Sequence, residues 1–351
     1  MADSELSVLS LLACPHDGTS LHQERAWVCC PRGHRFPVVG SVPVLLRDDA
    51  THTIGIAPQS LRLARLFAEG SCSDAYFTES LGLSDDERRQ VRAAIAANDD
   101  DVDPVISYLV GATNGVLYKH LIGSLSSYPI PTLPLPAARG ERLLDVGCSW
   151  GRWSIAAGRR GYNPVGIDPS LGAVLAARRL CDRLGVPFLG VVGDARYLPF
   201  KPGVFDVAYS YSVLQHFSKS DARLALHQIR RTLRDGGAFT IQMASAWGLR
   251  SFQHQVMRRS REPTQFEIRY WSPPELRRTF RDIFGDANMS ADCYFGLGLQ
   301  ASDLRIMPPA KRALIYGSEL MKGAARLISP LAYLADSLFL GGRAVRPSAV
   351  C

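Results

Sequence analysis

Arg142-Leu-Leu-Asp-Val-Gly-Cys-Ser-Trp-Gly151 is the stretch that decides the fold of this 351-residue chain. Its apolar strand pattern stops at a turn of small residues, and a helical pattern follows from Trp153 to Ala157. Glycine at Gly147 and Gly151 lets backbone N–H groups approach a ligand closely, and the helix directs the positive end of its dipole at the same place. The stretch therefore predicts a strand, a tight turn and a helix that hold a nucleotide-like ligand.

Four further strand-like segments follow in the order expected of a doubly wound α/β fold. Pro164–Asp168 ends in a carboxylate about twenty residues past the turn, where such folds place an acid that accepts ribose hydroxyls. The other three segments are each apolar and bounded by turn residues: Val191–Asp194, Phe205–Ser212 and Asp235–Met243. The series predicts strands that alternate with helices around one sheet.

Residues 140–245 resemble the class I S-adenosylmethionine-dependent methyltransferases, with a domain similar to the methyltransferase type 11 kind. The motifs that carry the resemblance are Leu144-Asp-Val-Gly-Cys148, Gly166-Ile-Asp168, Gly193-Asp-Ala195 and Phe205-Asp-Val207. A dehydrogenase is the main competitor, but the first turn fits Asp-x-Gly-x-x-x-Gly better than Gly-x-Gly-x-x-Gly. The resemblance implies a Rossmann-like α/β fold with a doubly wound, seven-stranded, mostly parallel sheet.

The resemblance also implies that S-adenosylmethionine is the cofactor. Its sulfonium and amino-acid end is expected near Asp145, its ribose at Asp168 and its adenine at Asp194. The predicted cofactor-binding residues lie in the turns after the strands: Asp145, Gly147, Cys148, Gly151, Asp168, Asp194, Ala195 and Tyr211. For the three acids the alternative is a plain turn cap, because short acidic side chains often cap turns.

His216 is the predicted catalytic residue. It follows the fourth strand, on the carboxyl edge of the sheet where ligands bind in such folds. Methyl transfer to oxygen requires removal of a proton, and the unperturbed pKa of histidine lies near neutrality. The alternatives for His216 are that it lines the pocket or caps the next helix. Phe266–Trp271 is either one wall of the acceptor site or packing for the helix that follows.

The amino-terminal region carries a second signature. Cys14-Pro-His-Asp-Gly18 and Cys30-Pro-Arg-Gly-His34 resemble the two knuckles of a small zinc-ribbon module of the tRNA-methyltransferase-activator type. The resemblance implies a structural zinc, with the ligand set Cys14, Asp17, Cys30 and His34. Asp17 stands where a second cysteine would complete a Cys-x-x-Cys knuckle, and a carboxylate also binds zinc. The alternative is a ribbon without metal that persists through apolar packing.

Composition and patterning divide the chain into four parts. We expect a zinc-ribbon-like module at 1–50, a helical cap with a proline-rich linker at 51–137, the methyltransferase domain at 138–300 and a helical extension at 301–351. The eight cysteines form no dense framework, and no amino-terminal apolar segment resembles a secretion signal. These features predict a cytoplasmic protein.

The segment Pro309–Leu340 is helical in pattern and apolar, with a basic side. The favoured interpretation is a helical hairpin packed on the core or on a second copy in a homodimer. The alternative is a helix that lies on the inner face of the membrane and brings the protein to a lipid-linked acceptor.

The predicted activity is methylation of a small molecule, sugar or lipid-linked saccharide, at oxygen. An RNA base is the alternative acceptor, because the formal net charge of +7 suits nucleic acid. Adenine-amine methyltransferases, however, carry Asn/Asp-Pro-Pro-Tyr/Phe where this chain has Ser210-Tyr-Ser-Val213. A third hypothesis is a non-catalytic scaffold that binds S-adenosylmethionine and protein partners.

Overall fold

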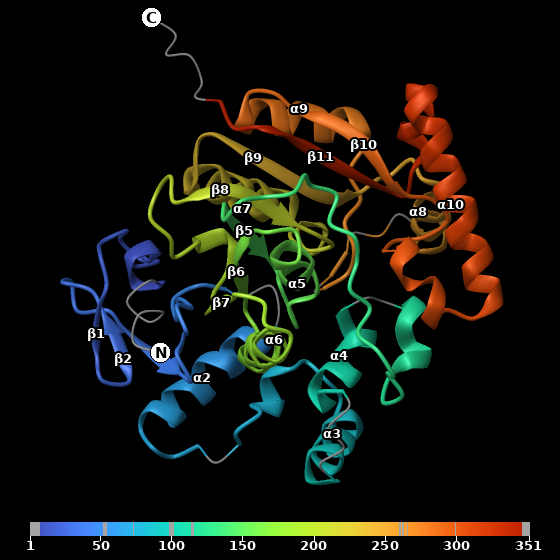
Figure 1. Ribbon diagram of the computed structural model, residues 1–351. Helices are drawn as coiled ribbons and strands as arrows, with labels where there is room; N and C mark the ends of the chain where they lie inside the picture. The colour runs from blue at the N-terminus through green and yellow to red at the C-terminus, as the bar shows by residue number, and fades with distance from the viewer. Residues whose placement is uncertain are drawn as a thin grey trace, which may run out of the picture.

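The computed structural model describes residues 8–345 except 52–54, 73, 98–101, 114–115, 260, 262, 265 and 299. At its centre is a seven-stranded sheet with the order β10-β11-β9-β8-β5-β6-β7 (Figure 1). The strands are β5 (Arg142–Val146), β6 (Asn163–Asp168), β7 (Leu189–Val192), β8 (Phe205–Ser210), β9 (Leu233–Ala244), β10 (Asn288–Cys293) and β11 (Ser337–Arg343). Only β11 runs antiparallel to its neighbours in this sheet. The prediction of a doubly wound, mostly parallel seven-stranded sheet is confirmed.

Helices cover both faces of the sheet because its strands are apolar on both sides. Leu143 and Tyr209 pack against α5 (Arg152–Gly158), while the adjacent residues Leu144 and Ala208 belong to the cluster that includes α7 (Lys219–Thr232) and α9 (Pro273–Phe284). The strand register sets Asp145 opposite Gly166 of β6 and Tyr209 of β8. The loops after β5, β6 and β8 therefore meet at one edge, the carboxyl edge of the sheet.

The helical region ahead of the sheet comprises α2 (Ile56–Ala68), η1 (Thr78–Ser80), α3 (Asp85–Ala97), α4 (Pro104–Thr113) and η2 (Val116–Leu121). It is joined to the start of α6 (Leu171–Arg183) by hydrogen bonds. Ser60 Oγ accepts from the Leu171 N–H at 3.0 Å, and Ser80 Oγ accepts from the Gly172 N–H at 2.8 Å. These side chains satisfy amides at a helix start that would otherwise lack partners.

The amino-terminal module is a four-stranded antiparallel sheet of β1 (His22–Glu24), β2 (Trp27–Cys29), β3 (Arg35–Val39) and β4 (Val42–Pro43). It lies against the outer edge of the large sheet, at β7 (Figure 1). The Leu45 N–H donates to Val192 O at 2.7 Å, and the Lys201 N–H donates to Leu11 O at 2.8 Å. The module thus covers an edge strand whose backbone groups would otherwise be unpaired.

The carboxyl-terminal part differs from the expectation of a helical extension at 301–351. Residues between β10 and β11 form η5 (Ala301–Ile306), α10 (Pro309–Leu327) and η6 (Ser329–Leu334), and the chain then returns as β11. Leu338 and Leu340 of β11 are fully buried between β9 and β10. The helices are therefore an insertion within the sheet domain. The run Ser337–Arg343 is short and follows apolar residues with helical spacing. The sequence pattern therefore does not distinguish a strand there from a continued helix.

A buried ion pair connects the helical region, α5 and the insertion. Arg152 of α5 donates to both carboxylate oxygens of Asp303 in η5, at 2.9 and 3.0 Å. The hydroxyl of Tyr118 in η2 donates to the same carboxylate. Asp303 and Tyr118 are fully buried, so three segments distant in sequence are held at one point. In the part of the chain that the structure describes, no helix has both the length and the apolar composition needed to cross a membrane.

Candidate functional site

The turn after β5 adopts a left-handed backbone at three positions. The φ angles are 78° at Gly147, 46° at Ser149 and 83° at Gly151. The Gly147 N–H donates to Ile167 O at 2.8 Å, which ties the turn to β6. A Cβ placed on Gly147 would lie 2.2 Å from Val213 Cγ2, in the loop after β8. Glycine is therefore required here both by the backbone and by the close approach of the second loop.

Two carboxylates flank this turn, one buried at Asp145 and one partly buried at Asp168. Asp145 accepts a hydrogen bond from Ser154 Oγ at 2.7 Å, and burial raises its pKa to about 7. Asp168 accepts from the Ser149 N–H at 3.0 Å and from the Ser170 N–H at 2.9 Å. Burial raises the pKa of Asp168 to about 6. Two amide donors leave acceptor positions on the Asp168 carboxylate, which has about four.

Unpartnered polar atoms lie on the turn after β5 and on the loop after β8. Ser149 Oγ and Gln215 Oε1 are buried and have no hydrogen-bond partner among the residues that the structure describes. Buried polar groups without partners are rare in folded proteins and require a ligand or water. Ser149 follows β5 and Gln215 follows β8, and Gly147 and Val213 bring these loops into contact. The edge therefore offers hydrogen bonds to a polar ligand.

Three other predicted cofactor-binding residues lie at this edge, but in different settings. Asp194 and Ala195 begin η3 (Ala195–Tyr197), and both Asp194 oxygens bind the guanidinium of Arg196, the shortest contact being 2.7 Å. This pairing competes with the adenine contact expected of Asp194. The side chain of Cys148 is buried in a core cluster with Leu171 and Val174, and its Sγ lies 3.7 Å from Ser149 O.

Tyr211 belongs to a polar cluster that the sequence analysis missed. Its hydroxyl donates to Asp292 Oδ2 at 2.9 Å and accepts from Gln300 Nε2 at 2.7 Å, while its ring lies 4.7 Å from that of Trp153. Asp292 is fully buried in β10, and burial raises its pKa. The signal in the sequence that could have indicated this cluster is Asp292, an acid near the end of a strand that runs to the carboxyl edge. Its partner Tyr211 lies 81 positions away in sequence.

His216 ends η4 (Leu214–His216), beside Phe266. The two rings stack at 3.8 Å, and His216 Nδ1 lies 2.8 Å from Phe266 O. Since a carbonyl oxygen only accepts, Nδ1 carries the proton and Nε2 of the neutral ring is unprotonated. Burial lowers the pKa of His216 to about 4, so the ring is neutral at pH 7. Arg269 donates to His216 O at 2.7 Å, so Phe266–Trp271 runs along the residue predicted as the base.

The four predicted metal ligands come together in the amino-terminal module. One ligand atom from each of Cys14, Asp17, Cys30 and His34 lies within 4.8 Å of the others. His34 Nδ1 is 3.6 Å from Cys14 Sγ, 3.2 Å from Cys30 Sγ and 3.3 Å from Asp17 Oδ2. Tetrahedral zinc places its ligand atoms about 3.3–3.8 Å apart, given bonds of about 2.0–2.3 Å. The spacing fits this geometry.

Asp17 is oriented toward the cluster by its neighbour. The Thr19 N–H and hydroxyl both donate to Asp17 Oδ1, at 2.9 and 2.6 Å. The second oxygen, Oδ2, lies 3.7 Å from Cys30 Sγ. Such outer hydrogen bonds fix a ligating carboxylate in metal sites. Asp17 thus occupies the fourth position that the sequence left without a cysteine.

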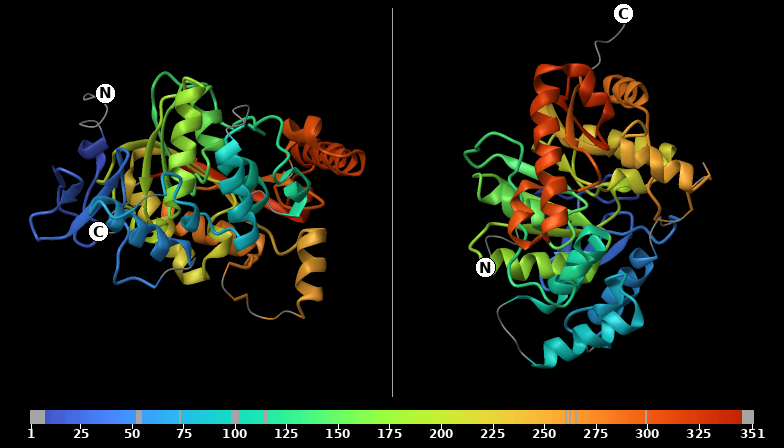
Figure 2. Two further views of the ribbon diagram at one scale, coloured as in Figure 1. Left: turned by 90° about the horizontal axis from the view of Figure 1, so that it is seen from below. Right: turned by 90° about the vertical axis from the view of Figure 1, so that its right-hand side faces the viewer.

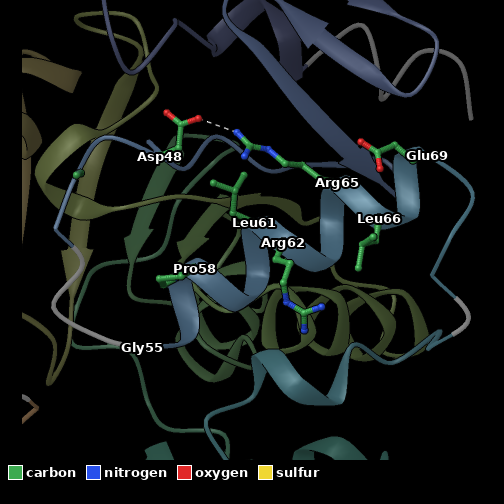
Figure 3. A pocket seen from close by; sticks show the side chains of 9 residues that line it. Asp48, Gly55, Pro58, Leu61, Arg62, Arg65, Leu66 and Glu69 are labelled. Atoms are coloured by element: carbon green, nitrogen blue, oxygen red, sulfur yellow. Dashed lines mark hydrogen bonds and ion pairs between the residues drawn. The ribbon is translucent and has the colours of Figure 1, made fainter.

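A separate open cavity of about 560 Å³ lies between the end of the amino-terminal module and α2 (Figure 3). Asp48, Pro58, Leu61, Arg62 and Arg65 are among the residues that line it. Arg65 is paired with Asp48 at 2.8 Å across the cavity. No predicted site residue lines this cavity, so it is distinct from the carboxyl edge of the sheet.

Residues 143–237 match a family model described as a methyltransferase domain. The chain is 30% identical over 103 residues to a ubiquinone biosynthesis O-methyltransferase of Azorhizobium caulinodans, with 29% of this chain and 40% of that protein covered. It is 32% identical over 102 residues to a demethylmenaquinone methyltransferase of Corynebacterium kroppenstedtii, with 29% and 41% covered. Each match spans less than half of the relative's length.

Among solved structures, a SAM-dependent methyltransferase from Methanosarcina mazei aligns with a TM-score of 0.44 at 15% identity. The alignment covers 59% of this chain and 94% of that one.

The raised pKa of Asp145 generates a prediction about stability. Its folded-state pKa of about 7 exceeds the unfolded value, so the folded state holds the proton to higher pH. The free energy of unfolding then falls as the pH rises from about 4 to about 7. Asp145→Asn keeps an oxygen that accepts from Ser154. This variant should lack the Asp145 contribution to the slope of unfolding free energy against pH, which is up to about 1.4 kcal/mol per pH unit.

Urea unfolding at several pH values measures this slope. The exposed Asp182→Asn is the control and should leave the slope as in the wild type. Equal slopes for Asp145→Asn and the wild type would contradict a buried, protonated Asp145.

Proposed function

We infer that this chain, whose residues 143–237 form a class I S-adenosylmethionine-dependent methyltransferase domain, methylates an oxygen of a small molecule, sugar or lipid-linked saccharide. The observation that carries the proposal is the pairing of two loops at the carboxyl edge. One loop is the left-handed glycine turn beside Asp168, and the other carries His216 with an unprotonated ring nitrogen.

The residues at this edge fit the cofactor. S-adenosylmethionine, when bound, supplies an electrophilic methyl group. The remaining acceptor capacity of Asp168 suits ribose hydroxyls, and the unpartnered Ser149 Oγ and Gln215 Oε1 offer further hydrogen bonds. Gly147 and Gly151 add no side chain of their own to the turn at the start of α5, whose dipole favours a carboxylate there.

His216 would act as the general base. Its Nδ1–H is held by Phe266 O, which fixes the ring and directs Nε2 as the acceptor of a hydroxyl proton. Burial lowers its pKa to about 4, so the base is in its active form throughout the neutral range. The imidazolium formed on proton transfer is a strong acid in this setting and releases its proton readily.

The acceptor is proposed from the surroundings and from the relatives' names. Trp153, Tyr211 and Phe266 lie close to the two loops, and aromatic rings suit a partly apolar small molecule or a sugar face. Two relatives are named for ubiquinone and menaquinone methylation. The net charge of +7 favours an RNA base as the second candidate acceptor.

Cofactor binding tests the first part of the proposal. Titration calorimetry should show that S-adenosylmethionine and S-adenosylhomocysteine bind the wild type and that Asp168→Ala binds them at least about tenfold more weakly, because the ribose hydroxyls lose a charged acceptor. Asp182→Ala, which removes an exposed acid on α6, is the matched control. Wild-type protein that binds neither compound would contradict the proposal.

Turnover tests the role of His216. The acceptor is first identified by transfer of labelled methyl groups to a panel of quinols, sugars, polyprenyl-linked saccharides and tRNA. His216→Gln should then lower kcat by about 100-fold to 10,000-fold, with cofactor affinity unchanged. Wild-type kcat should fall only as the pH drops toward the His216 pKa of about 4, because the base is then protonated. A variant that loses cofactor affinity and keeps kcat would assign His216 to the pocket wall.

We also propose that Cys14, Asp17, Cys30 and His34 hold one structural zinc ion. The ligand-atom spacing and the orientation of Asp17 by Thr19 support this proposal. A structural metal would stabilise a module whose own core is small.

Metal analysis of dialysed protein should give about one zinc per chain. The Asp17→Ala and His34→Ala proteins should hold less than about one zinc per chain. They should also unfold at a lower temperature than the wild type, because zinc binding contributes to folding. His22→Ala removes an exposed histidine from the same module and should retain the metal. Metal-free wild type that melts at the same temperature with and without added zinc would show that packing alone holds the ribbon.

A further inference from the structure

Exposed apolar side chains gather on two helices of this protein. Among the residues that the structure describes, fifteen large apolar side chains are exposed, and ten of them lie in residues 247–257 and 316–334. The first group belongs to α8 (Leu249–Met257) and the residues before it, and the second belongs to α10 and η6. Met257 is 74% exposed, Leu320 is 76% exposed and Leu327 is 88% exposed. We name this the α8–α10 surface.

The two groups form one surface. The rings of Trp247 and Tyr333 lie 6.1 Å apart, which joins the start of α8 to η6. Asp336, buried after η6, accepts from the Ser251 N–H of α8 at 2.7 Å and from the Gly296 N–H at 3.2 Å. α8 and α10 project on the same side of the molecule (Figure 2). One buried carboxylate therefore ties α8 to the segment before β11 and to the loop after β10.

Helical spacing places the apolar residues on the outer face of each helix. Tyr316, Leu320 and Leu327 follow one another by four and seven positions, which sets them along one side of α10. Phe252 and Val256 lie three and seven positions after Leu249 at the start of α8. An apolar stripe of this kind normally packs against another surface.

The charges around the apolar residues are positive. α8 contains no acidic residue, and Arg250 and Arg259 beside it are exposed. Arg326 is exposed next to Leu327, and Glu319, the one acid of α10, is paired with Lys322 at 2.8 Å. A basic rim around exposed apolar side chains complements a surface of anionic headgroups over acyl chains.

We propose that the α8–α10 surface binds an anionic phospholipid bilayer, with its apolar side chains in the boundary between headgroups and acyl chains. The sequence expectation placed a membrane contact on the carboxyl-terminal helices alone, and the tertiary structure adds α8 to it. The proposal concerns binding and does not rest on the proposed methylation.

The surface borders the candidate active site. α8 follows β9 and the α10 insertion follows β10, and both strands end at the carboxyl edge of the sheet. Phe266, in the segment after α8, is 48% exposed and stacks on His216. A bilayer on this surface would present lipid-linked molecules close to the proposed base.

Vesicle flotation with the full chain tests the proposal. Vesicles of phosphatidylcholine with about one quarter phosphatidylglycerol should carry the protein, and vesicles of phosphatidylcholine alone should carry much less. Leu320→Gln with Leu327→Gln should weaken the partition coefficient at least about tenfold, because two apolar side chains no longer enter the boundary. Leu184→Gln with Leu224→Gln alters two exposed leucines elsewhere and should leave partition unchanged.

The charged rim is tested separately. Arg259→Gln with Arg326→Gln should weaken binding to the anionic vesicles and reduce its salt sensitivity, because fewer cations face the headgroups. Absence of binding to anionic vesicles, or binding equal in the wild type and the leucine variant, would overturn the proposal. A dimer in light scattering that the leucine variant dissociates, without vesicle binding, would assign the surface to a second copy of the chain.

Discussion

The close approach of two loops at Gly147 is the constraint on which the site depends. A side chain at this position would meet Val213 at 2.2 Å, and the backbone there is left-handed. Because Gly147 has no side chain, the loop after β8 lies directly against the turn after β5. This contact places the segment that carries Gln215 and His216 beside the turn whose amide at Ser149 bonds to Asp168. The proposed site combines residues of both loops because of that proximity.

The same edge buries several ionisable groups, which is costly for stability and typical of functional sites. Desolvation raises the pKa of Asp145, Asp168 and Asp292, and it lowers that of His216. Each keeps a hydrogen-bond partner in the fold, so the groups are fixed in orientation. His216, as the proposed general base, would need no rearrangement before it accepts a proton.

The additions to the sheet attach where the sheet itself is incomplete. The amino-terminal module pairs with the outer strand β7 through Leu45 and Val192, and so covers one edge. The insertion between β10 and β11 enters from the opposite side and is tied to α5 by the Arg152–Asp303 ion pair. Removing either partner of such a buried pair would leave an uncompensated buried charge and would be strongly destabilising. The ion pair thus holds the start of the insertion against α5, beside the carboxyl edge of the sheet.

The sequence by itself determined the features that depend on local pattern: the glycine turn, the acids near the ends of β5 and β6, and the two Cys-Pro knuckles of the ribbon. Strand and turn signals are short-range, because backbone conformation and side-chain spacing act over a few residues. Only the tertiary structure decided which distant residues meet. It paired Tyr211 with Asp292, placed β11 inside the sheet and tied α8 to the segment before β11 through Asp336. These contacts link segments tens of residues apart, and packing of the whole core, which no local pattern encodes, selects them.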